Sequence, residues 1–294
     1  MAATIRNPIE WSWDQLRHIG QGVRKVGDAA SHIEDRLHAP VPAVRRVGVA
    51  ELWQVLRRGA ADFGACRTDV LFLCAVYPIA GLLLGRAVYG HDLLPLLFPI
   101  AAGFAILGPA ASIGMYQLSR LRERQAEGIG WSAAFGVLRA PAVGAIGLLA
   151  LYLVGLFLLW LGAAWLIYAA TLGPEPPAGA GAFLDDVFGT AAGWTMILVG
   201  CGVGFLFALA AMAISLVSFP LLLDRDVGLD TAVRTSLRAM RVNPLPMAVW
   251  GLVVAGLLVL GSIPLLLGLI VVLPLLGHAT WHLYRALILP PSGG

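Results

Sequence analysis

The sequence is poor in charged residues. Only 13% of its 294 residues are Asp, Glu, Lys or Arg, whereas a soluble domain carries about 25%. This shortage argues against an ordinary soluble protein, and the mean hydropathy of +0.83 points the same way. Where charge is missing over about 20 residues or more, the chain is long and apolar enough to cross a membrane as a helix.

Sequence motifs of common catalytic sites are also missing. The chain has no glycine-rich phosphate loop, no serine nucleophile elbow, no CxxC pair and no nucleic-acid-binding motif. Its three cysteines, Cys66, Cys74 and Cys201, are odd in number and fall in or near apolar blocks, which predicts buried, reduced thiols. We therefore expect a protein that is not an enzyme, carries no cofactor and binds no nucleic acid.

The uncharged blocks predict an all-α, polytopic membrane protein with six transmembrane helices. The last block is too long for a bilayer core of about 30 Å, so it must double back, and residues 261–264 form the natural turn. Because no Asp, Glu, Lys or Arg lies in the middle of a predicted span, a proton-coupled carrier is not expected. The predicted spans are 70–89, 93–117, 142–171, 192–222, 247–262 and 265–286.

Positive residues mark one side of the predicted membrane domain. Ten of the twenty Lys and Arg residues precede position 69, four lie in 120–139 and four in 225–241. Only Arg86 falls on the other side, and the loop 173–190 has no Lys or Arg. The positive-inside rule therefore places both termini in the cytoplasm of a bacterium and the spans in its inner membrane. The pI near 9.0 then reflects topology and contact with anionic lipids.

The second and sixth predicted spans share a sequence pattern at an offset of 165 positions. The fourth span ends on a shorter echo, 223–225, so that each returning helix finishes with Leu-x-Arg. Such recurrence predicts three hairpins built on one plan. The matched pairs are Gly103 and Gly268, Pro109 and Pro274, Tyr116 and Trp281, Leu118 and Leu283, and Arg120 and Arg285.

A short amphipathic segment precedes each predicted hairpin, at 49–58, at 131–139 and after Asp230. A segment of this kind either lies in the membrane interface with its arginines toward lipid phosphates or packs on the helical bundle. For the third segment, the lipid-contacting candidates are Arg234, Arg238 and Arg241, beside an apolar stripe of Val233, Leu237 and Met240.

The chain divides into three predicted regions: a cytoplasmic amphipathic helix at 1–40, a linker with an interfacial helix at 41–68, and a six-span membrane domain at 69–289. The first thirty residues lack a continuous apolar core, so we expect no cleavable signal peptide, with the first span directing insertion. Apolar residues recur every seven positions over 9–37, which is typical of a helix that pairs with a partner helix. The alternatives are packing on the membrane domain and disorder. The recurring residues are Ile9, Leu16, Val23, Ala30 and Leu37.

Two histidines in the sixth predicted span, His278 and His282, are four residues apart and therefore share one helical face. This spacing suits metal or haem ligation, but a metal needs further donors. The remaining reading is hydrogen bonding to neighbouring helices or lipid. The additional donor candidates are Cys66, Cys74, Asp224 and Asp226.

Three stretches resemble the signature sequences of a family of uncharacterised bacterial integral membrane proteins, grouped as a domain of unknown function. They read FPIAAGFAILGPAASIGMYQLSRLRE, SFPLLLDRDVGLDTAVRTSLRAMRVNP and VVLPLLGHATWHLYR, and the resemblance covers about residues 45–287. It implies an inner-membrane protein and no established activity. Some relatives carry a cytochrome c oxidase subunit I label. The sequence speaks against this label, since such subunits hold two haems and a copper with about six membrane histidines, and here only two histidines fall in predicted spans.

The sequence thus favours a non-catalytic scaffold, assembly or interaction component in the lipid bilayer, with a membrane-protein or helical partner held through 9–37. The first alternative is a carrier or channel for a small neutral or lipid-like solute. Its binding site would lie where Pro109 and Pro274 break the second and sixth spans. The less favoured alternative is a metal- or haem-binding membrane subunit that uses His278 and His282.

Overall fold

Residues 41–65, 94–124, 131–264 and 267–290 are described by a computed structural model of the chain. They fold into helices joined by short connections, and their β-structure is one isolated bridge between Val44 and Ile288. The expectation of an all-α fold is confirmed for this part of the chain. The helix predicted in 1–40 and the first predicted span, 70–89, lie outside the described residues.

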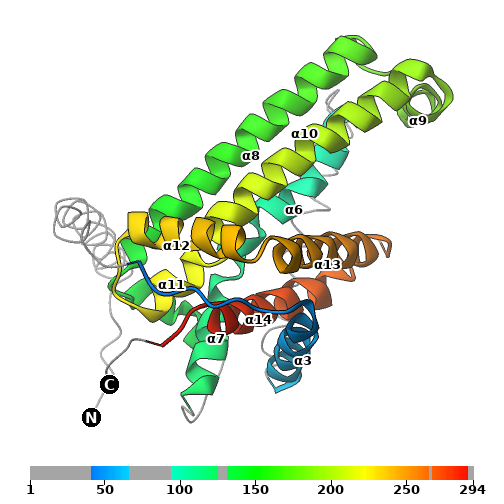
Figure 1. The fold of residues 1–294 in the computed structure, drawn as a ribbon. Coiled ribbons are helices and arrows are strands. Elements are labelled where there is room, and N and C mark those ends of the chain that lie inside the picture. The colour runs from blue at the N-terminus through cyan, green and yellow to red at the C-terminus, as the bar shows by residue number, and fades with distance from the viewer. Residues whose placement is uncertain (1–40, 66–93, 125–130, 265–266, 291–294) are drawn as a thin grey trace, which may run out of the picture.

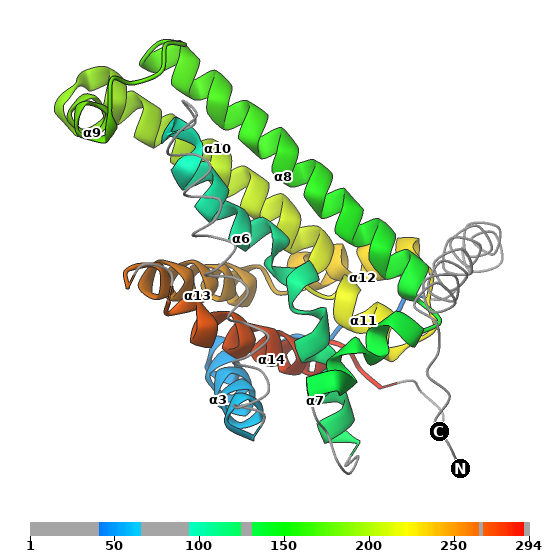
Figure 2. The same cartoon turned by 180° about the vertical axis from the view of Figure 1, so that it is seen from behind.

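The helices are arranged as a long arm on a broader base (Figure 1). In chain order they are α3 (Val49–Ala65), the 3₁₀ helix η1 (Leu94–Leu96), α6 (Leu97–Ala111), α7 (Ile113–Glu123), the 3₁₀ helix η2 (Trp131–Arg139), α8 (Val143–Thr171), α9 (Ala180–Gly189), α10 (Ala191–Ser215), α11 (Ser218–Asp224), α12 (Leu229–Val242), α13 (Pro244–Ser262) and α14 (Leu269–Leu287). In the arm α8, α10 and α6 lie side by side, and α9 closes its far end (Figures 1 and 2).

The arm contains the longest candidate membrane-spanning helices. α8 has 29 residues, or about 43 Å at a rise of about 1.5 Å per residue, which exceeds a hydrocarbon core of about 30 Å. Among the described residues, three helical segments are long and apolar enough to span, and a bent pair, Leu94–Gly103 with Ala105–Ala111, makes a fourth if it counts as one span. The three segments are Val143–Thr171, Ala191–Asp224 and Pro244–Ser262.

These segments coincide with the third, fourth and fifth predicted spans, and the bent pair coincides with the second. The sixth predicted span corresponds to α14, which is not among the candidates. The described residues therefore contain three or four candidate spans. The count of six, arranged as three hairpins, stays a prediction.

Trp160 of α8 organises the middle of the arm. Its indole nitrogen donates a hydrogen bond of 3.0 Å to the carbonyl oxygen of Pro99 in α6. A Cβ at Gly204 of α10 would lie 3.0 Å from the Trp160 ring, so the absence of a side chain there lets α10 approach closely. Phe207, one turn further along α10, packs against the ring at a centroid distance of 5.8 Å. One indole thus joins all three arm helices.

The base contains α3, α7, α11, α12 and α14, and the pair α13 and α14 runs across the direction of the arm (Figures 1 and 2). α13 and α14 meet closely at their connection, where a Cβ on Gly268 would lie 2.7 Å from the Cα of Gly261. α14 packs against α3, α7 and α13, so most of its side chains are buried. Burial by other helices, rather than contact with lipid, therefore accounts for the apolar character of α14.

The three predicted amphipathic segments are all helical, but they differ in kind. Segment 49–58 is part of α3, which packs on α14, so packing on the bundle holds for this segment. Segment 131–139 is the 3₁₀ helix η2. In α12 the fully buried face is made of small and polar residues, while the apolar stripe beside it is only half-buried. The buried residues of α12 are Thr231, Ala232, Thr235, Ser236 and Ala239.

Two features of the arm differ from expectation. The loop 173–190 contains the helix α9, whose end is held against α10: the Thr190 hydroxyl accepts a hydrogen bond of 2.9 Å from the backbone NH of Gly193 and so caps α10.

Cys201 of α10 is a free, exposed cysteine, so the prediction of a buried thiol is wrong for this residue. An apolar block that faces outward exposes every side chain on that face, including a thiol.

Candidate functional site: a buried polar cluster at the base

Asp62 lies on the buried face of α3. The other buried residues of this helix, Leu52, Val55 and Gly59, precede it at helical spacing and form the face that packs on α14. Gly59 allows the close approach, because a Cβ there would lie 2.6 Å from the backbone nitrogen of Ala279. The helix thereby carries a carboxylate into the contact between α3, α7 and α14, where it is 8% exposed.

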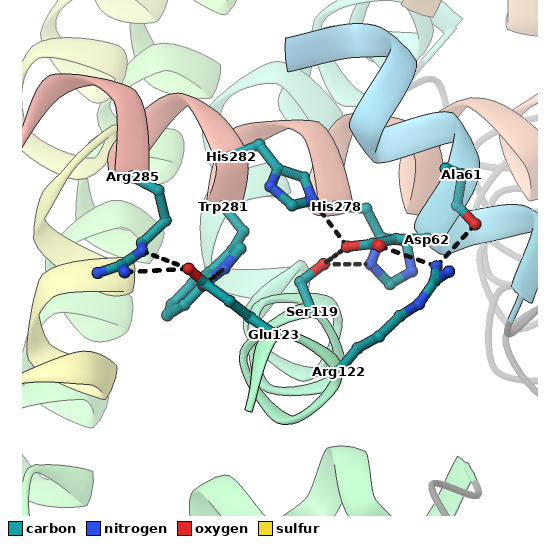
Figure 3. Close-up of polar contacts among 9 residues, drawn as sticks. All are labelled: Ala61, Asp62, Ser119, Arg122, Glu123, His278, Trp281, His282 and Arg285. Atoms are coloured by element: carbon teal, nitrogen blue, oxygen red, sulfur yellow. Dashed lines mark hydrogen bonds and ion pairs between the residues drawn. The ribbon is translucent and has the colours of Figure 1, made fainter. Parts of the chain in front are cut away.

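Five side chains from these three helices form a connected group, here called the Asp62 cluster: Asp62, Ser119, Arg122, His278 and His282 (Figure 3). The Ser119 hydroxyl donates to Asp62 Oδ2 at 2.6 Å, and His282 Nε2 lies 2.8 Å from the same oxygen. Arg122 Nη1 donates to Asp62 Oδ1 at 2.9 Å and to the carbonyl oxygen of Ala61 at 2.8 Å. Both carboxylate oxygens are therefore used.

The Asp62 carboxyl is held in its ionised form. Burial by itself raises the pKa of a carboxyl group, but the hydrogen bonds from His282 and Ser119 outweigh burial and hold the pKa of Asp62 below its usual value. The positive charge of Arg122, in a direct ion pair at 2.9 Å, compensates the buried negative charge. The cluster thus fixes a charged group between three helices that are distant in the sequence.

The Asp62 cluster contains serine, histidine and aspartate, but their order differs from that of a hydrolytic triad. In a triad the aspartate orients the histidine, and the histidine takes the proton of the serine. Here Ser119 donates directly to Asp62, so His278 Nδ1, 2.8 Å from Ser119 Oγ, must donate to the serine oxygen. Ser119 is also 1% exposed. A substrate cannot reach it, and the arrangement serves packing rather than nucleophilic attack.

The two histidines do lie on one face, and each reaches a partner in the cluster through one nitrogen. His278 is fully buried, and its Nε2 atom has no hydrogen-bond partner among the described residues. In the part of the chain that the structure describes, no group of three or more His, Cys, Asp or Glu residues is arranged to hold a metal ion. Of the further donor candidates, Cys66 and Cys74 lie outside that part. The geometry thus supports hydrogen bonding between helices.

A second ionic group, here called the Asp224 junction, lies at the end of α11. Asp224 accepts a hydrogen bond of 2.8 Å from the Tyr284 hydroxyl. Three guanidinium groups surround the same carboxylate at 3.6 Å: those of Arg120 in α7, of Arg124 directly after α7, and of Arg285 in α14. Asp224, a metal-donor candidate in the sequence, is therefore engaged with arginines.

The Asp224 junction brings the three Leu-x-Arg endings together. Its carboxylate belongs to the ending 223–225, and its partners Arg120 and Arg285 belong to the endings 118–120 and 283–285. The leucine of each ending is buried, with an exposed fraction of 1% to 4%. The repeat seen in the sequence thus corresponds to a shared environment: three chain segments meet at one carboxylate.

A neighbouring carboxylate, Glu123 at the end of α7, extends the contact with α14. Its two oxygens accept hydrogen bonds from the indole nitrogen of Trp281, at 3.1 Å, and from Arg285 Nε, at 3.0 Å (Figure 3). Trp281 also packs against Tyr284 at a centroid distance of 5.4 Å. The aromatic residues at the end of α14 are therefore both packed and hydrogen-bonded at the base.

The proline breaks lie close to a crossing of the two repeated segments. Pro109 is inside α6, just before the break at Ser112, and Pro274 is inside α14. A Cβ on Gly277 would lie 2.9 Å from the Cβ of Met115 and 3.2 Å from that of Ser112. Ser112 and Gly277 are themselves 165 positions apart, so equivalent residues face each other. The crossing is tightly packed, which gives no support to a solute site between the broken helices.

The arginines predicted to contact lipid are exposed on α12. Arg234 forms an ion pair of 2.9 Å with Asp230, one turn earlier. Within the described residues, Arg238 and Arg241 form no ion pair. These three arginines are separate from the Asp62 cluster and the Asp224 junction, and they line the outer surface of the base.

The helices that carry the arm and much of both ionic groups, α6 to α11, correspond to a recognised family segment. Residues 97–224 match the family described as "Predicted integral membrane protein (DUF2189)". The match covers less than half of the chain and ends on Asp224 itself, so α3, α12, α13 and α14 lie outside it. It agrees with the sequence resemblance for the first quoted stretch and the start of the second. No curated protein and no solved structure matches the chain.

Asp62 and Ser119 are members of the cluster that the sequence does not single out. The predicted amphipathic segment ends at residue 58, whereas in the structure the buried spacing of Leu52 and Val55 continues through Gly59 to Asp62. A lone carboxylate on an otherwise apolar face is the signal that predicts a buried partner. Ser119 carries no such signal, because a serine within a helix usually faces solvent or bonds to its own backbone.

Proposed function

We propose that this protein is a non-catalytic scaffold or assembly component of the bacterial inner membrane, with six spans in three hairpins and both termini in the cytoplasm. The observation that carries the proposal is the docking of 43–65 on the base. This segment directly follows the predicted N-terminal helix. A helix joined to a fixed platform presents its apolar face at a defined position on the membrane surface, which is what an assembly component requires.

Backbone and side-chain bonds hold the docked segment along its whole length. The backbone NH of Arg45 donates to the carbonyl oxygen of Leu287 at 2.7 Å, and that of Leu289 donates to the carbonyl oxygen of Ala43 at 3.2 Å. The Asn243 side chain, just before α13, accepts from the NH of Val47 at 2.8 Å. The Asp62 cluster then fixes the last turns of α3. The segment is thus integrated with the membrane domain.

The placement of charge supports the proposed orientation. The arginines of α3, α7, α12 and α14 lie at the base. The far end of the arm carries Glu175, Asp185 and Asp186 and, between α8 and α10, no arginine or lysine. Under the positive-inside rule the base faces the cytoplasm.

A cysteine-labelling experiment tests the orientation. In a variant that lacks the three native cysteines, we expect Gly179→Cys, in the open connection before α9, to react in intact cells with a reagent that does not cross the inner membrane. Arg241→Cys, exposed on α12, is the matched position at the base and reacts only after the membrane is opened. The opposite pattern, or equal labelling of both, contradicts the orientation.

Quantitative co-purification tests the scaffold function. The full-length protein, extracted from native membranes, is expected to recover a specific membrane protein at least tenfold more efficiently than a variant with Leu16→Glu and Val23→Glu, because two charges on the recurring apolar positions abolish helix pairing. The control variant, Gln21→Glu with Ser31→Glu, adds the same charge off those positions and retains the partner. Identical recovery by all three proteins refutes a partner held through 9–37.

A further inference from the structure

An open apolar groove lies where α12 meets the arm. It has a volume of about 550 Å³, within the range of about 300–1,000 Å³ that is usual for ligand sites. Its walls come from the first turns of α8, from Ile214 at the end of α10, and from Leu229 and Val233 of α12. Apart from the Tyr152 ring, the side chains that line it are aliphatic.

The α8 wall faces outward from the protein. Leu148, Leu151 and Tyr152 are each more than half exposed, although they belong to a helix apolar enough to span a membrane. In a bilayer such side chains contact acyl chains. Leu149, beside them, is 2% exposed and forms the floor of the groove. The groove is thus open along its length to the hydrocarbon that surrounds the arm.

The α12 wall joins this apolar surface to positive charge. Val233 lines the groove, and Arg234 follows it on the exposed side of the same helix. Arg238 continues the arginine stripe one turn further and forms no ion pair with any described residue. A guanidinium group binds a phosphate through two parallel hydrogen bonds. An apolar groove with an exposed arginine directly after one of its lining residues matches a molecule that has an acyl chain and an anionic phosphate head, which would compete with Asp230 for Arg234.

We propose that this groove is a binding site for one anionic phospholipid, with an acyl chain against α8 and Ile214 and the phosphate at Arg234 and Arg238. Charge complementarity favours a lipid over a protein helix as the occupant, because an apolar helix offers no anionic group to Arg234 and Arg238. The proposal is independent of the scaffold function and of the side of the membrane that the base faces.

A photoreactive lipid tests the proposal. The full-length protein is reconstituted in phosphatidylcholine vesicles with a trace of phosphatidylglycerol that carries a diazirine in its acyl chain. Adducts are expected to concentrate on residues 148–152 and on Val233. Unlabelled phosphatidylglycerol and unlabelled phosphatidylcholine are then compared as competitors of the probe. The anionic lipid is expected to displace the probe at about one fifth of the concentration that the zwitterionic lipid needs, or less, because a single arginine near a lipid surface attracts an anionic lipid roughly fivefold.

Two pairs of variants sharpen the test. Leu148→Trp fills the groove and is expected to lower labelling at least fivefold, whereas Leu198→Trp, on an equally apolar and more exposed part of α10, leaves it unchanged. Arg234→Gln with Arg238→Gln abolishes the preference for the anionic lipid, and Arg58→Gln on α3 retains it. All of the substituted residues are exposed, so we expect every variant to fold.

Three results overturn the proposal. The first is an even spread of adducts over the exposed faces of α8 and α10. The second is equal competition by the anionic and the zwitterionic lipid. The third is a protein cross-linked in native membranes at a photoreactive residue replacing Leu148, which would show that a protein partner occupies the groove.

Discussion

Replacing Asp62 by alanine is expected to lower the free energy of unfolding by about 3 kcal/mol, because it removes one side of a buried ionic group. Ser119 and His282 each lose a hydrogen-bond acceptor, and Arg122 loses its ion pair. Ser119 is so deeply buried that water cannot replace Asp62 as the hydrogen-bond acceptor of its hydroxyl group. The change is measured as a loss of thermal stability of the full-length protein in detergent.

Asp185→Ala is the matched control for this prediction. Asp185 lies exposed on α9, so the same substitution there is expected to change the free energy of unfolding by less than about 0.5 kcal/mol. Equal effects of the two substitutions would show that the Asp62 cluster does not stabilise the fold.

The pH dependence identifies the charge of Asp62 as the cause. The folded-state pKa of Asp62 lies below the unfolded value of about 3.9. Its ionised form therefore stabilises the protein fully above about pH 4, and this contribution is lost as the pH falls through the folded pKa. The groups that face the side chain of residue 62, His278, His282 and Arg122, are the same in the wild type and in Asp62→Asn. The stability difference between the wild type and Asp62→Asn should therefore shrink below about pH 4, and a difference that grows there contradicts the assignment.

Gly59→Val is expected to separate α3 from α14. A Cβ at Gly59 would lie 2.6 Å from the backbone nitrogen and 2.7 Å from the Cα of Ala279. Backbone atoms cannot relieve a clash by changing rotamer as a side chain does, so the two helices must move apart. We expect a loss of at least about 2 kcal/mol in the free energy of unfolding, together with faster amide hydrogen exchange throughout α3.

Gly64→Val provides the control in the same helix. No atom lies within 4 Å of a Cβ built at Gly64, so the substitution replaces glycine by a β-branched residue without a clash. Its effect on helix propensity is the same as that of Gly59→Val. If both variants unfold at the same temperature and α3 remains protected in both, the close contact with Ala279 is unimportant.

The arm could be predicted from the sequence because its signal is local. A helix such as α8, with 29 residues and no charge, is apolar all round and needs no knowledge of its neighbours to be recognised. The candidate spans in α8, α10 and α13 fall within a few residues of the predicted boundaries for this reason. The match to the integral membrane family also centres on this part of the chain.

The base was less predictable, because its contacts join residues that are far apart. α14 is as apolar as a span in its first half, yet α3 and α7 cover it. Nothing in the local pattern distinguishes an apolar helix buried by protein from one covered by lipid. The helix α9 was missed for a related reason: ten residues with two acids and two glycines carry a weak periodic signal, and its contact with α10 stabilises it.

The site was predicted in part. The histidine pair was identified from its spacing, but its partner Asp62 is more than 200 positions away in the sequence, and no motif connects the two. The Leu-x-Arg recurrence, in contrast, was visible as a repeat. What the repeat could not reveal is that the acidic residue of one copy neutralises the arginines of the other two.

The shared carboxylate makes the three Leu-x-Arg endings mutually dependent. Arg120 and Arg285 both approach Asp224, at 3.6 Å, so each arginine is neutralised by a copy other than its own. A chain without the ending 223–225 would leave Arg120 with no ion pair among the described residues, whereas Arg285 would keep its ion pair of 3.0 Å with Glu123. The carboxylate of the ending 223–225 therefore decides whether the guanidinium group of Arg120 is compensated at the base.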